Sequence, residues 1–408
     1  MRLDRSTTVG VLGAGAMGAG IAQVALRHGH EVLLADARPD AAPEAAARIA
    51  QALAREVEKG RLAQAEANAA VRRLTPVRGV EDLSPFARCG LMIEAVVEDL
   101  AVKRDVFRRL EREVGDDAVL ATNTSSLSIA SIAGACRRPE RVLGVHFFNP
   151  APVMPLVEIV PAMATDPSVA TTTRALVDGW GKTTVLAADT PGFIVNRVAR
   201  PFYGESLRLL DEAIADAPTI DWAMRELGGF RMGPFELMDF IGLDVNFAVT
   251  RSVYEQTFHD PRYRPSLTQQ RLVEAGRLGR KAGRGFYDHA EGAARPEPTR
   301  DEALGRRILH RVLAMLVNEA FDAVHWRVAS AADVELAMTK GVNYPSGLIA
   351  WGARLGLEVV LGELDALRET YQEDRYRASP LLRRAAREGL GVLGAPFAGA
   401  GAAAGAPA

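Results

Sequence analysis

The chain has 408 residues, with 49 lysines and arginines, 51 aspartates and glutamates and a formal net charge of −2. This length allows two or three domains, and the mixed charge argues against binding of nucleic acid or a membrane surface through bulk charge. No apolar run is long enough to span a bilayer, no signal peptide is expected, and the two cysteines lack metal-ligand spacing. We therefore expect a cytoplasmic protein without a bound metal.

A glycine-rich turn near the start of the chain has the context of a dinucleotide-binding site. An apolar strand is expected at residues 7–12, the motif G-A-G-A-M-G follows at 13–18, and a helix continues through 19–26. The first glycine permits a tight turn, the second lets the backbone approach a pyrophosphate, and the third lets helix and strand pack closely. The helix N-terminus offers N–H groups and a positive dipole end to the phosphates. The expected cofactor contacts come from Gly13, Gly15, Ala16, Met17 and Gly18.

An acidic residue follows where this motif requires one. The next strand, at residues 31–35, is followed directly by Asp36. A carboxylate there can accept hydrogen bonds from both ribose hydroxyls and would repel a 2′-phosphate. The sequence therefore predicts an NAD site rather than an NADP site, with Arg38 as a contrary signal.

Polar side chains follow three further strands. These strands are expected at residues 90–99, 118–122 and 141–145. Glu98, Ser125 and His146 lie at or just beyond their ends, and Lys103 falls in the first turn of an expected helix over 100–114. Ligands of open parallel sheets bind beyond the carboxyl ends of the strands. We therefore expect these side chains at the same sheet edge as the glycine-rich turn.

The segment 146–160 carries the clearest candidate for acid–base chemistry. Its three prolines exclude a helix interior, so we expect a strand ending near His146, a stiff crossing loop that includes Asn149, and a return strand that carries Glu158. A neutral imidazole held by a carboxylate is a general base whose tautomer is set by its partner. On these residues alone, a core histidine and a solvent-facing strand glutamate are the alternative interpretation.

The pattern changes to long helices after Pro191. We expect a first domain at residues 1–190, a helical domain at 191–287 whose first and longest helix runs from Ile194 to Ala215, and a linker at 288–301 that is rich in Gly, Ala and Pro. A second helical copy is expected at residues 302–390 and a disordered tail at 391–408.

The second helical stretch echoes the first in order. Residues 313–320 resemble 206–213, residues 332–338 resemble 220–224, residues 344–348 resemble 233–237, and residues 374–380 resemble 260–266. The offset drifts from roughly 107 to roughly 114 positions. A kept order with a nearly constant offset predicts a duplicated helical domain.

Together these motifs resemble those of the 3-hydroxyacyl-CoA dehydrogenases, including the 3-hydroxybutyryl-CoA and 3-hydroxyadipyl-CoA enzymes. The matching segments are Gly13–Gly18, Glu94–Glu98, Asn123–Leu127, His146–Pro150, Asp189–Arg197, Gly233–Asp239 and Gly283–Tyr287. The resemblance implies an α/β Rossmann domain followed by an all-α domain, here in two copies. It also implies the reversible, NAD-dependent oxidation of an (S)-3-hydroxyacyl-CoA to the 3-ketoacyl-CoA.

The resemblance further implies roles for individual residues. His146 resembles the base that takes the proton of the 3-hydroxyl, with Glu158 as its orienting carboxylate. Ser125 and Asn196 resemble the hydrogen-bonding pair that orients the substrate or the histidine. The positions that resemble supports or contacts of the cofactor are Asn149, Glu98 and Lys103. The helical region from Arg48 to Arg61 resembles, more loosely, the part of the family that contacts CoA.

Several points stay open at the level of the sequence. A Rossmann dehydrogenase of a free hydroxy acid and a non-catalytic NAD-binding relative are the competing functions. Members with duplicated helical domains include enzymes of phenylacetate breakdown, which use 3-hydroxyadipyl-CoA, and 3-hydroxybutyryl-CoA enzymes. Because short members dimerise through the helical domain, the two copies are expected to form an internal pseudo-dimer, with a homo-oligomer still possible.

Overall fold

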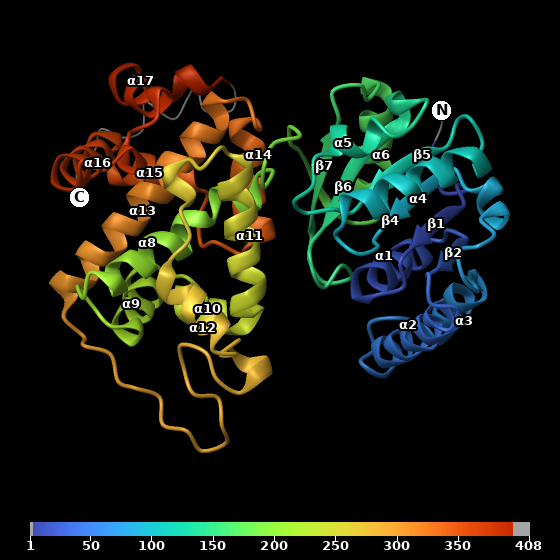
Figure 1. Cartoon of the computed structure of the whole chain (residues 1–408), viewed down its shortest axis with the longest axis horizontal. Coiled ribbons are helices and arrows are strands. Elements are labelled where there is room, and N and C mark those ends of the chain that lie inside the picture. Colours follow the sequence, from blue (N-terminus) through green and yellow to red (C-terminus); the bar gives the residue numbers. More distant parts are fainter. Residues whose placement is uncertain (1–2, 395–408) are drawn as a thin grey trace. The chain divides into compact units, whose positions relative to one another are not determined.

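The computed structural model describes residues 3–394, and these divide into two compact units between Thr190 and Pro191 (Figure 1). The expected disordered tail lies outside the described residues from position 395 onward. Its first part is ordered, because Leu390–Leu393 form a short 3-10 helix. Among residues 3–394, none of the helices combines the length and hydrophobicity that a transmembrane span requires.

The first unit is built on one eight-stranded sheet with the order β3-β2-β1-β4-β5-β6-β7-β8. The strands are β1 (Val9–Leu12), β2 (Val32–Ala35), β3 (Leu74–Val77), β4 (Leu91–Glu94), β5 (Val119–Thr122), β6 (Val142–Phe147), β7 (Leu156–Pro161) and β8 (Thr183–Leu186). All pairs are parallel except β6 with β7. The order of the first six strands is that of a Rossmann fold.

Most strands of this sheet consist largely of apolar residues, because helices cover both faces of the sheet. Strands β1, β2, β4 and β5 are buried along their whole length, as expected for parallel strands between helices. The helices are α1 (Ala16–Arg27), α2 (Ala41–Glu58), α3 (Gln64–Arg72), α4 (Leu100–Glu113), α5 (Ile129–Ala133) and α6 (Pro167–Asp178). Apolar side chains of α1, α2, α3 and α6 share one core with the sheet.

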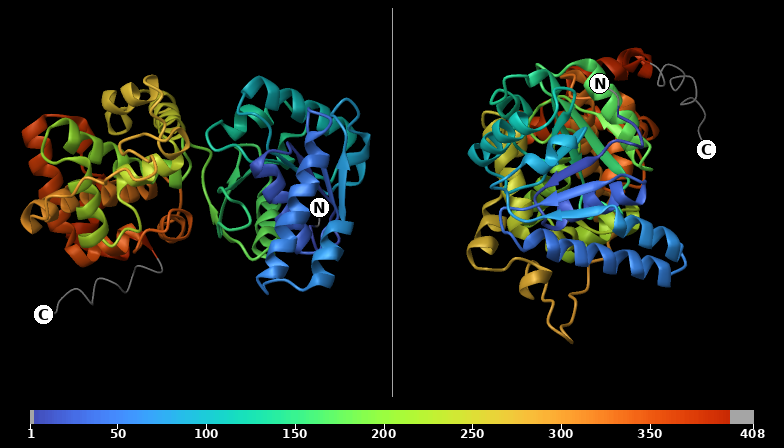
Figure 2. Two further views of the ribbon diagram at one scale, coloured as in Figure 1. Left: turned by 90° about the horizontal axis from the view of Figure 1, so that it is seen from below. Right: turned by 90° about the vertical axis from the view of Figure 1, so that its right-hand side faces the viewer.

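Over its described residues, 191–394, the second unit is built of helices and turns, with two isolated β-bridges at Arg284. Its α-helices are α7 (Val195–Val198), α8 (Arg200–Asp211), α9 (Ala217–Trp222), α10 (Pro234–Ile241), α11 (Leu243–Gln256), α12 (Leu267–Glu274), α13 (Glu302–His325), α14 (Ala331–Leu336), α15 (Leu348–Leu355), α16 (Leu357–Tyr371) and α17 (Pro380–Glu388). Helix α13 contacts elements of both halves of this unit, from α7 and α8 to α16 and α17 (Figures 1 and 2).

The single helix expected from Ile194 to Ala215 is wrong. The chain forms a four-residue helix, α7, and then starts α8 at Arg200, with Pro201 in the first turn of α8. Proline lacks an N–H and is favoured in the first turn of a helix, so it marks a new start here. Helix α13, with 24 residues, is longer than either.

The expected linker, residues 288–301, has no helix or strand but is fastened to the helical unit. The Arg295 guanidinium donates to Glu236 Oε1 over 2.5 Å. The backbone N–H of Thr299 donates to the hydroxyl of Thr219 over 2.9 Å. The segment is therefore a docked connection rather than a free tether.

Candidate active site

The glycine-rich turn has the geometry that its three glycines predict. Gly13 has φ +103°, and a Cβ there would lie 2.4 Å from the carbonyl oxygen of Ala95. A Cβ on Gly18 would lie 1.7 Å from the carbonyl oxygen of Gly13. Around Gly15, by contrast, no described atom lies within 4 Å of a built Cβ. The turn is thus closed against β4 and α1 and open beside Gly15, where a pyrophosphate needs space.

Asp36 lies beside this turn at the end of β2. Its Oδ2 accepts a hydrogen bond from the N–H of Ala14 over 2.7 Å, and its Oδ1 accepts from the N–H of Arg38 over 3.0 Å. The Arg38 guanidinium pairs with Glu44 at 2.9 Å, and both side chains are exposed. The turn, the first turn of α1 and Asp36 therefore fit the pyrophosphate and the adenosine ribose of NAD.

An ion-pair network joins the ends of β4 and β5, with Lys103 and Glu94 buried and Glu98 exposed. Lys103 Nζ lies 2.6 Å from Glu94 Oε1 and 3.2 Å from Glu98 Oε2, and it donates to the Val96 carbonyl over 3.4 Å. Glu94 is fully buried and also accepts from the Thr122 hydroxyl over 2.7 Å. The sequence interpretation assigned Lys103 to the cofactor and did not single out Glu94, its nearest partner.

Glu98 ties the loop after β5 to the end of β4. It accepts hydrogen bonds from the Thr124 hydroxyl, from the Ser125 N–H at 3.2 Å and from the Ser126 hydroxyl at 2.9 Å. Burial acts to raise the pKa of Glu98, but the charge of Lys103 and the hydroxyl donors outweigh it and hold the pKa below its ordinary value. Glu98 is therefore an ionised anchor that fixes the backbone of Ser125.

His146 and Glu158 are brought together by direct pairing of β6 and β7. They are partners in the antiparallel register, and Nδ1 of His146 lies 2.7 Å from Glu158 Oε2. The two residues are 5% and 0% exposed, and the Phe148 ring lies 4.5 Å from the imidazole, centroid to centroid. With Glu158 ionised, the proton of the neutral imidazole sits on Nδ1 and the lone pair on Nε2. This arrangement can exchange a proton with a ligand hydroxyl.

Two side chains that sequence reasoning missed hold the segment around this pair. Asn123 Oδ1 accepts from the N–H of Phe147 over 2.8 Å, which fastens the end of β6 to the loop after β5. Lys182 Nζ donates to the carbonyls of Ala151 and Met154 over 2.5 and 2.8 Å. Burial, with a smaller contribution from the charge of Arg27, lowers the pKa of Lys182 to about 8. Asn123 lies inside a matched motif, whereas no sequence signal marks Lys182.

The candidate residues of the first unit share one sheet edge. Because β2, β1, β4, β5 and β6 are adjacent and parallel, their carboxyl ends bring Asp36, the glycine-rich turn, Glu98, Ser125 and His146 to that edge in this order. Asn149 is exposed on the loop after β6. Asn196 belongs to the second unit, half-buried in α7, and its pairing with Ser125 or His146 stays a prediction.

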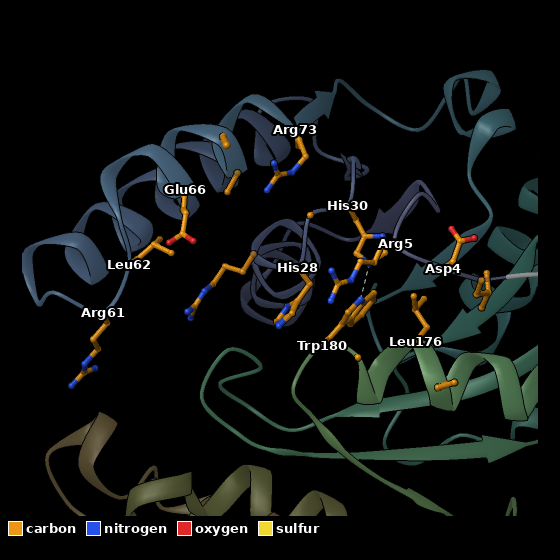
Figure 3. Close-up of a pocket in the computed structure, with 17 residues that line it drawn as sticks. Asp4, Arg5, His28, His30, Arg61, Leu62, Glu66, Arg73, Leu176 and Trp180 are labelled. Carbon is orange, nitrogen blue, oxygen red and sulfur yellow. Dashed lines mark hydrogen bonds between the residues drawn. The ribbon is translucent and has the colours of Figure 1, made fainter.

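A cavity of about 740 Å³ lies at the other end of the strands and contains none of these residues (Figure 3). His30 is fixed there, since Trp180 Nε1 donates to its Nε2 and its Nδ1 lies 2.8 Å from the Thr7 carbonyl. Arg73 donates to the Leu26 carbonyl near the C-terminus of α1. Basic side chains at helix C-termini complement the helix dipole, so the charge of Arg73 has a structural explanation.

Comparisons with known proteins agree with this geometry. The family model described as "3-hydroxyacyl-CoA dehydrogenase, NAD binding domain" matches residues 8–190, and the model of the C-terminal domain of that family matches residues 192–289 and 308–393. The 3-hydroxyadipyl-CoA dehydrogenase of Escherichia coli K12 is 39% identical over 93% of this chain and 97% of its own length. The probable 3-hydroxybutyryl-CoA dehydrogenase of Bacillus subtilis is 40% identical over 69% of this chain and 96% of its own. A crystal structure of 3-hydroxybutyryl-CoA dehydrogenase from Escherichia coli K12 matches with a TM-score of 0.89 and 38% identity, over 94% of this chain and 99% of that one.

Proposed function

The chain belongs to the 3-hydroxyacyl-CoA dehydrogenase family of NAD-dependent enzymes, and from this premise we propose that His146 and Glu158 are its acid–base pair. The substrate is an (S)-3-hydroxyacyl-CoA, which is oxidised reversibly to the 3-ketoacyl-CoA. The observation that carries the proposal is the contact of 2.7 Å between two buried side chains that are direct partners of adjacent strands.

In the oxidation, Nε2 of His146 takes the proton of the 3-hydroxyl. NAD, when bound, accepts the hydride that leaves C3. Glu158 keeps the proton of the neutral imidazole on Nδ1 and stabilises the imidazolium that forms, as the aspartate does for the histidine of a catalytic triad. In the reduction, the imidazolium returns the proton to the oxygen of the 3-keto group. Ser125 and Asn196 are the proposed donors that orient the substrate.

The cofactor would be held by residues on either side of β1. Gly15 and the first turn of α1 would take the pyrophosphate, and Asp36 would take the adenosine ribose. Glu98 and Lys103 lie further along the same edge, and Asn149 follows β6. We assign all three to the support of the nicotinamide end of the site.

We propose 3-hydroxybutyryl-CoA or 3-hydroxyadipyl-CoA as the substrate, because the relatives named for these compounds match the chain over most of their own length. Initial rates with NAD and each CoA ester, with free 3-hydroxybutyrate as the control, test the proposal. Oxidation of the free acid alone would support a hydroxy acid dehydrogenase instead. Binding of NAD without any turnover would support a non-catalytic relative.

We also propose that residues 302–390 are a second copy of the helical domain. Equivalent features recur 114 positions apart. A π-helix occupies residues 223–227 and again residues 337–341. Asp221 accepts from the first N–H groups of α10, and Glu335 accepts from those of α15. On this proposed alignment Glu205 corresponds to Glu319. The offset of roughly 107 expected for residues 206–213 and 313–320 differs from this spacing by about two helical turns.

The two copies exchange equivalent contacts, which supports an internal pseudo-dimer. Arg197 of the first copy pairs with Glu319 of the second at 2.8 Å. Arg311 of the second copy pairs with Glu205 of the first at 2.7 Å. Each arginine and each glutamate lies 114 positions from its counterpart. Reciprocal contacts of this kind are what a two-fold interface between identical subunits produces.

A further inference from the structure

Two buried clusters of charged and aromatic side chains join the copies of the helical unit. In the first cluster, Glu319 Oε1 lies 2.8 Å from Arg197 Nε and also accepts from the Tyr263 hydroxyl. Arg262 pairs with Asp322 and, at 3.4 Å, with Glu319 Oε2. Burial acts to lower the pKa of Arg197, but Glu319 and Tyr263 outweigh it and raise the pKa above its ordinary value. The guanidinium therefore stays charged, and Glu319 is its nearest counter-charge.

The second cluster repeats this chemistry with the roles of the copies exchanged. Glu205 Oε1 lies 2.7 Å from Arg311 Nε and accepts from the Tyr376 hydroxyl over 2.8 Å. Arg375 lies 3.7 Å from Glu205 Oε2. The two glutamates are both 2% exposed. The second cluster has one further carboxylate, because Arg311 also pairs with Glu212 at 2.9 Å. The chain therefore contains two matched clusters whose central glutamates are equally buried.

The clusters differ in the helix to which each arginine belongs. Arg197 lies in α7, a helix of only four residues that has no side-chain cap at its N-terminus. Just before it, Phe193 has φ +47°, a conformation that L-residues rarely adopt. A single helical turn has little stability of its own, so α7 depends on its tertiary contacts. Arg311, by contrast, lies within the 24-residue helix α13.

Helix α7 also carries Asn196, directly before Arg197. At the equivalent place in the second copy, 114 positions later, the chain has His310. The anchor of α7 therefore matters for a proposed substrate-binding residue, whereas its counterpart on α13 lies next to no residue of the proposed site.

We propose that Glu319, contributed by the second helical copy, is a positioning residue for the reaction: by holding Arg197 it fixes helix α7 and the side chain of Asn196. The proposal rests on the proposed function, which assigns Asn196 to the orientation of the substrate. It gives the second copy a role in the site beyond the burial of apolar surface.

The matched clusters allow a controlled test in the full-length enzyme. Glu319→Gln and Glu205→Gln each remove the nearest carboxylate of a buried arginine, so both variants should lose thermal stability. The loss should be smaller for Glu205→Gln, because Arg311 keeps Glu212 at 2.9 Å, whereas Arg197 keeps Asp322 at 4.0 Å. At a temperature well below both transitions, Glu319→Gln should lower kcat by roughly tenfold, since small misplacements of a substrate-orienting group are costly. Glu205→Gln should stay within about twofold of the wild type. NADH affinity should be unchanged in both. Equal kcat values for the two variants would overturn the proposal.

A milder pair of variants serves if Glu319→Gln does not fold. Tyr263→Phe removes one hydrogen bond to Glu319, and Tyr376→Phe removes the equivalent bond to Glu205. Only Tyr263→Phe should lower kcat, and equal rates would overturn the proposal. Asn196→Ala tests the proposed substrate contact of Asn196 separately from the positioning role of Glu319. A lower kcat for Asn196→Ala together with a normal kcat for Glu319→Gln would remove the positioning role alone, whereas full activity of Asn196→Ala would remove both assignments.

Discussion

At the scale of single residues, the account depends on a histidine and a glutamate that face each other across two strands. Residues directly opposite in an antiparallel pair have adjacent side chains on one face of the sheet. For His146 and Glu158 this places an imidazole and a carboxylate in hydrogen-bond contact, and both side chains belong to the strands rather than to the loop that joins them. The pairing of the two strands therefore fixes the positions of the imidazole and the carboxylate relative to each other.

His146→Gln should lower kcat by about 10²–10⁴-fold, because the general base is lost. NADH affinity should change little, since Asp36 and the glycine-rich turn lie on other strands. Steady-state rates and an NADH titration of the same preparation check both points.

Glu158→Gln, which keeps the size of the side chain, should also lower kcat and alter the pH–rate profile. Wild-type rates for His146→Gln would exclude it as the base, and an unchanged profile for Glu158→Gln would make Glu158 a strand residue only.

Lys182 leads to a prediction about stability and pH. Its pKa is about 8 in the folded protein against an ordinary value of 10.5, because burial disfavours the ammonium. Between these two pH values the unfolded chain binds more protons than the folded one, so the stability of the wild type should rise with pH across this window. Lys182→Met should lack this rise. Urea unfolding of both proteins at the two ends of the window measures it, and identical slopes would contradict the assigned state of Lys182.

The residues of the site were predictable where chemistry requires a fixed residue type in a fixed place. Glycines at a tight turn and a carboxylate after β2 leave such a signal, and so do His146 and Glu158. Glu94 lies inside a matched segment, but nothing in the sequence indicates its contact with Lys103, because any strand can end in an acid. Lys182 leaves no signal, because a lysine can approach any loop. Their roles depend on distances between segments far apart in the chain.

At the scale of elements, two glycines of the glycine-rich turn serve different purposes. Gly18 allows the turn and α1 to pack closely, whereas Gly15 leaves space for the pyrophosphate. Gly18→Ala places a Cβ against the Gly13 carbonyl and should destabilise the first unit. Gly15→Ala meets no described atom within 4 Å, and Gly15 has a φ of −68°, which alanine adopts readily. It should therefore keep the melting temperature and lose NADH affinity by about tenfold or more, or roughly 1.4 kcal/mol. Wild-type affinity in Gly15→Ala would contradict the position assigned to the pyrophosphate.

Long or motif-bearing elements were predictable, and short ones at the sheet edges were not. The strands that carry the site fall where apolar runs predict them. Strand β3 was missed, because it is only partly buried and its four residues include Thr75 and Pro76 rather than a continuous apolar run. The break between α7 and α8 was missed because the apolar pattern continues across Pro201. The internal repeat stays a prediction, and the local likeness of two Glu-Ala pairs gave one of its segments an offset that differs by two turns from the spacing proposed above.

At the scale of the whole molecule, the account predicts that the proposed second copy takes the place of a dimer partner. A chain shortened to end at Asp288 would lose Glu319 and Asp322, the partners of Arg197 and Arg262. Removing one partner of a buried ion pair costs about 3–5 kcal/mol. The shortened chain should therefore dimerise through the exposed face or lose its fold, as measured by light scattering and circular dichroism. A monomeric, well-folded shortened chain would contradict the pseudo-dimer.

The measurement that tests the central claim most directly is the oxidation of NADH by the full-length protein with acetoacetyl-CoA and with 3-oxoadipyl-CoA, side by side. The account predicts turnover of at least one of the two, and the ratio of the kcat/KM values assigns the acyl group. Binding of NADH without turnover of either compound would contradict the catalytic roles given to His146 and Glu158.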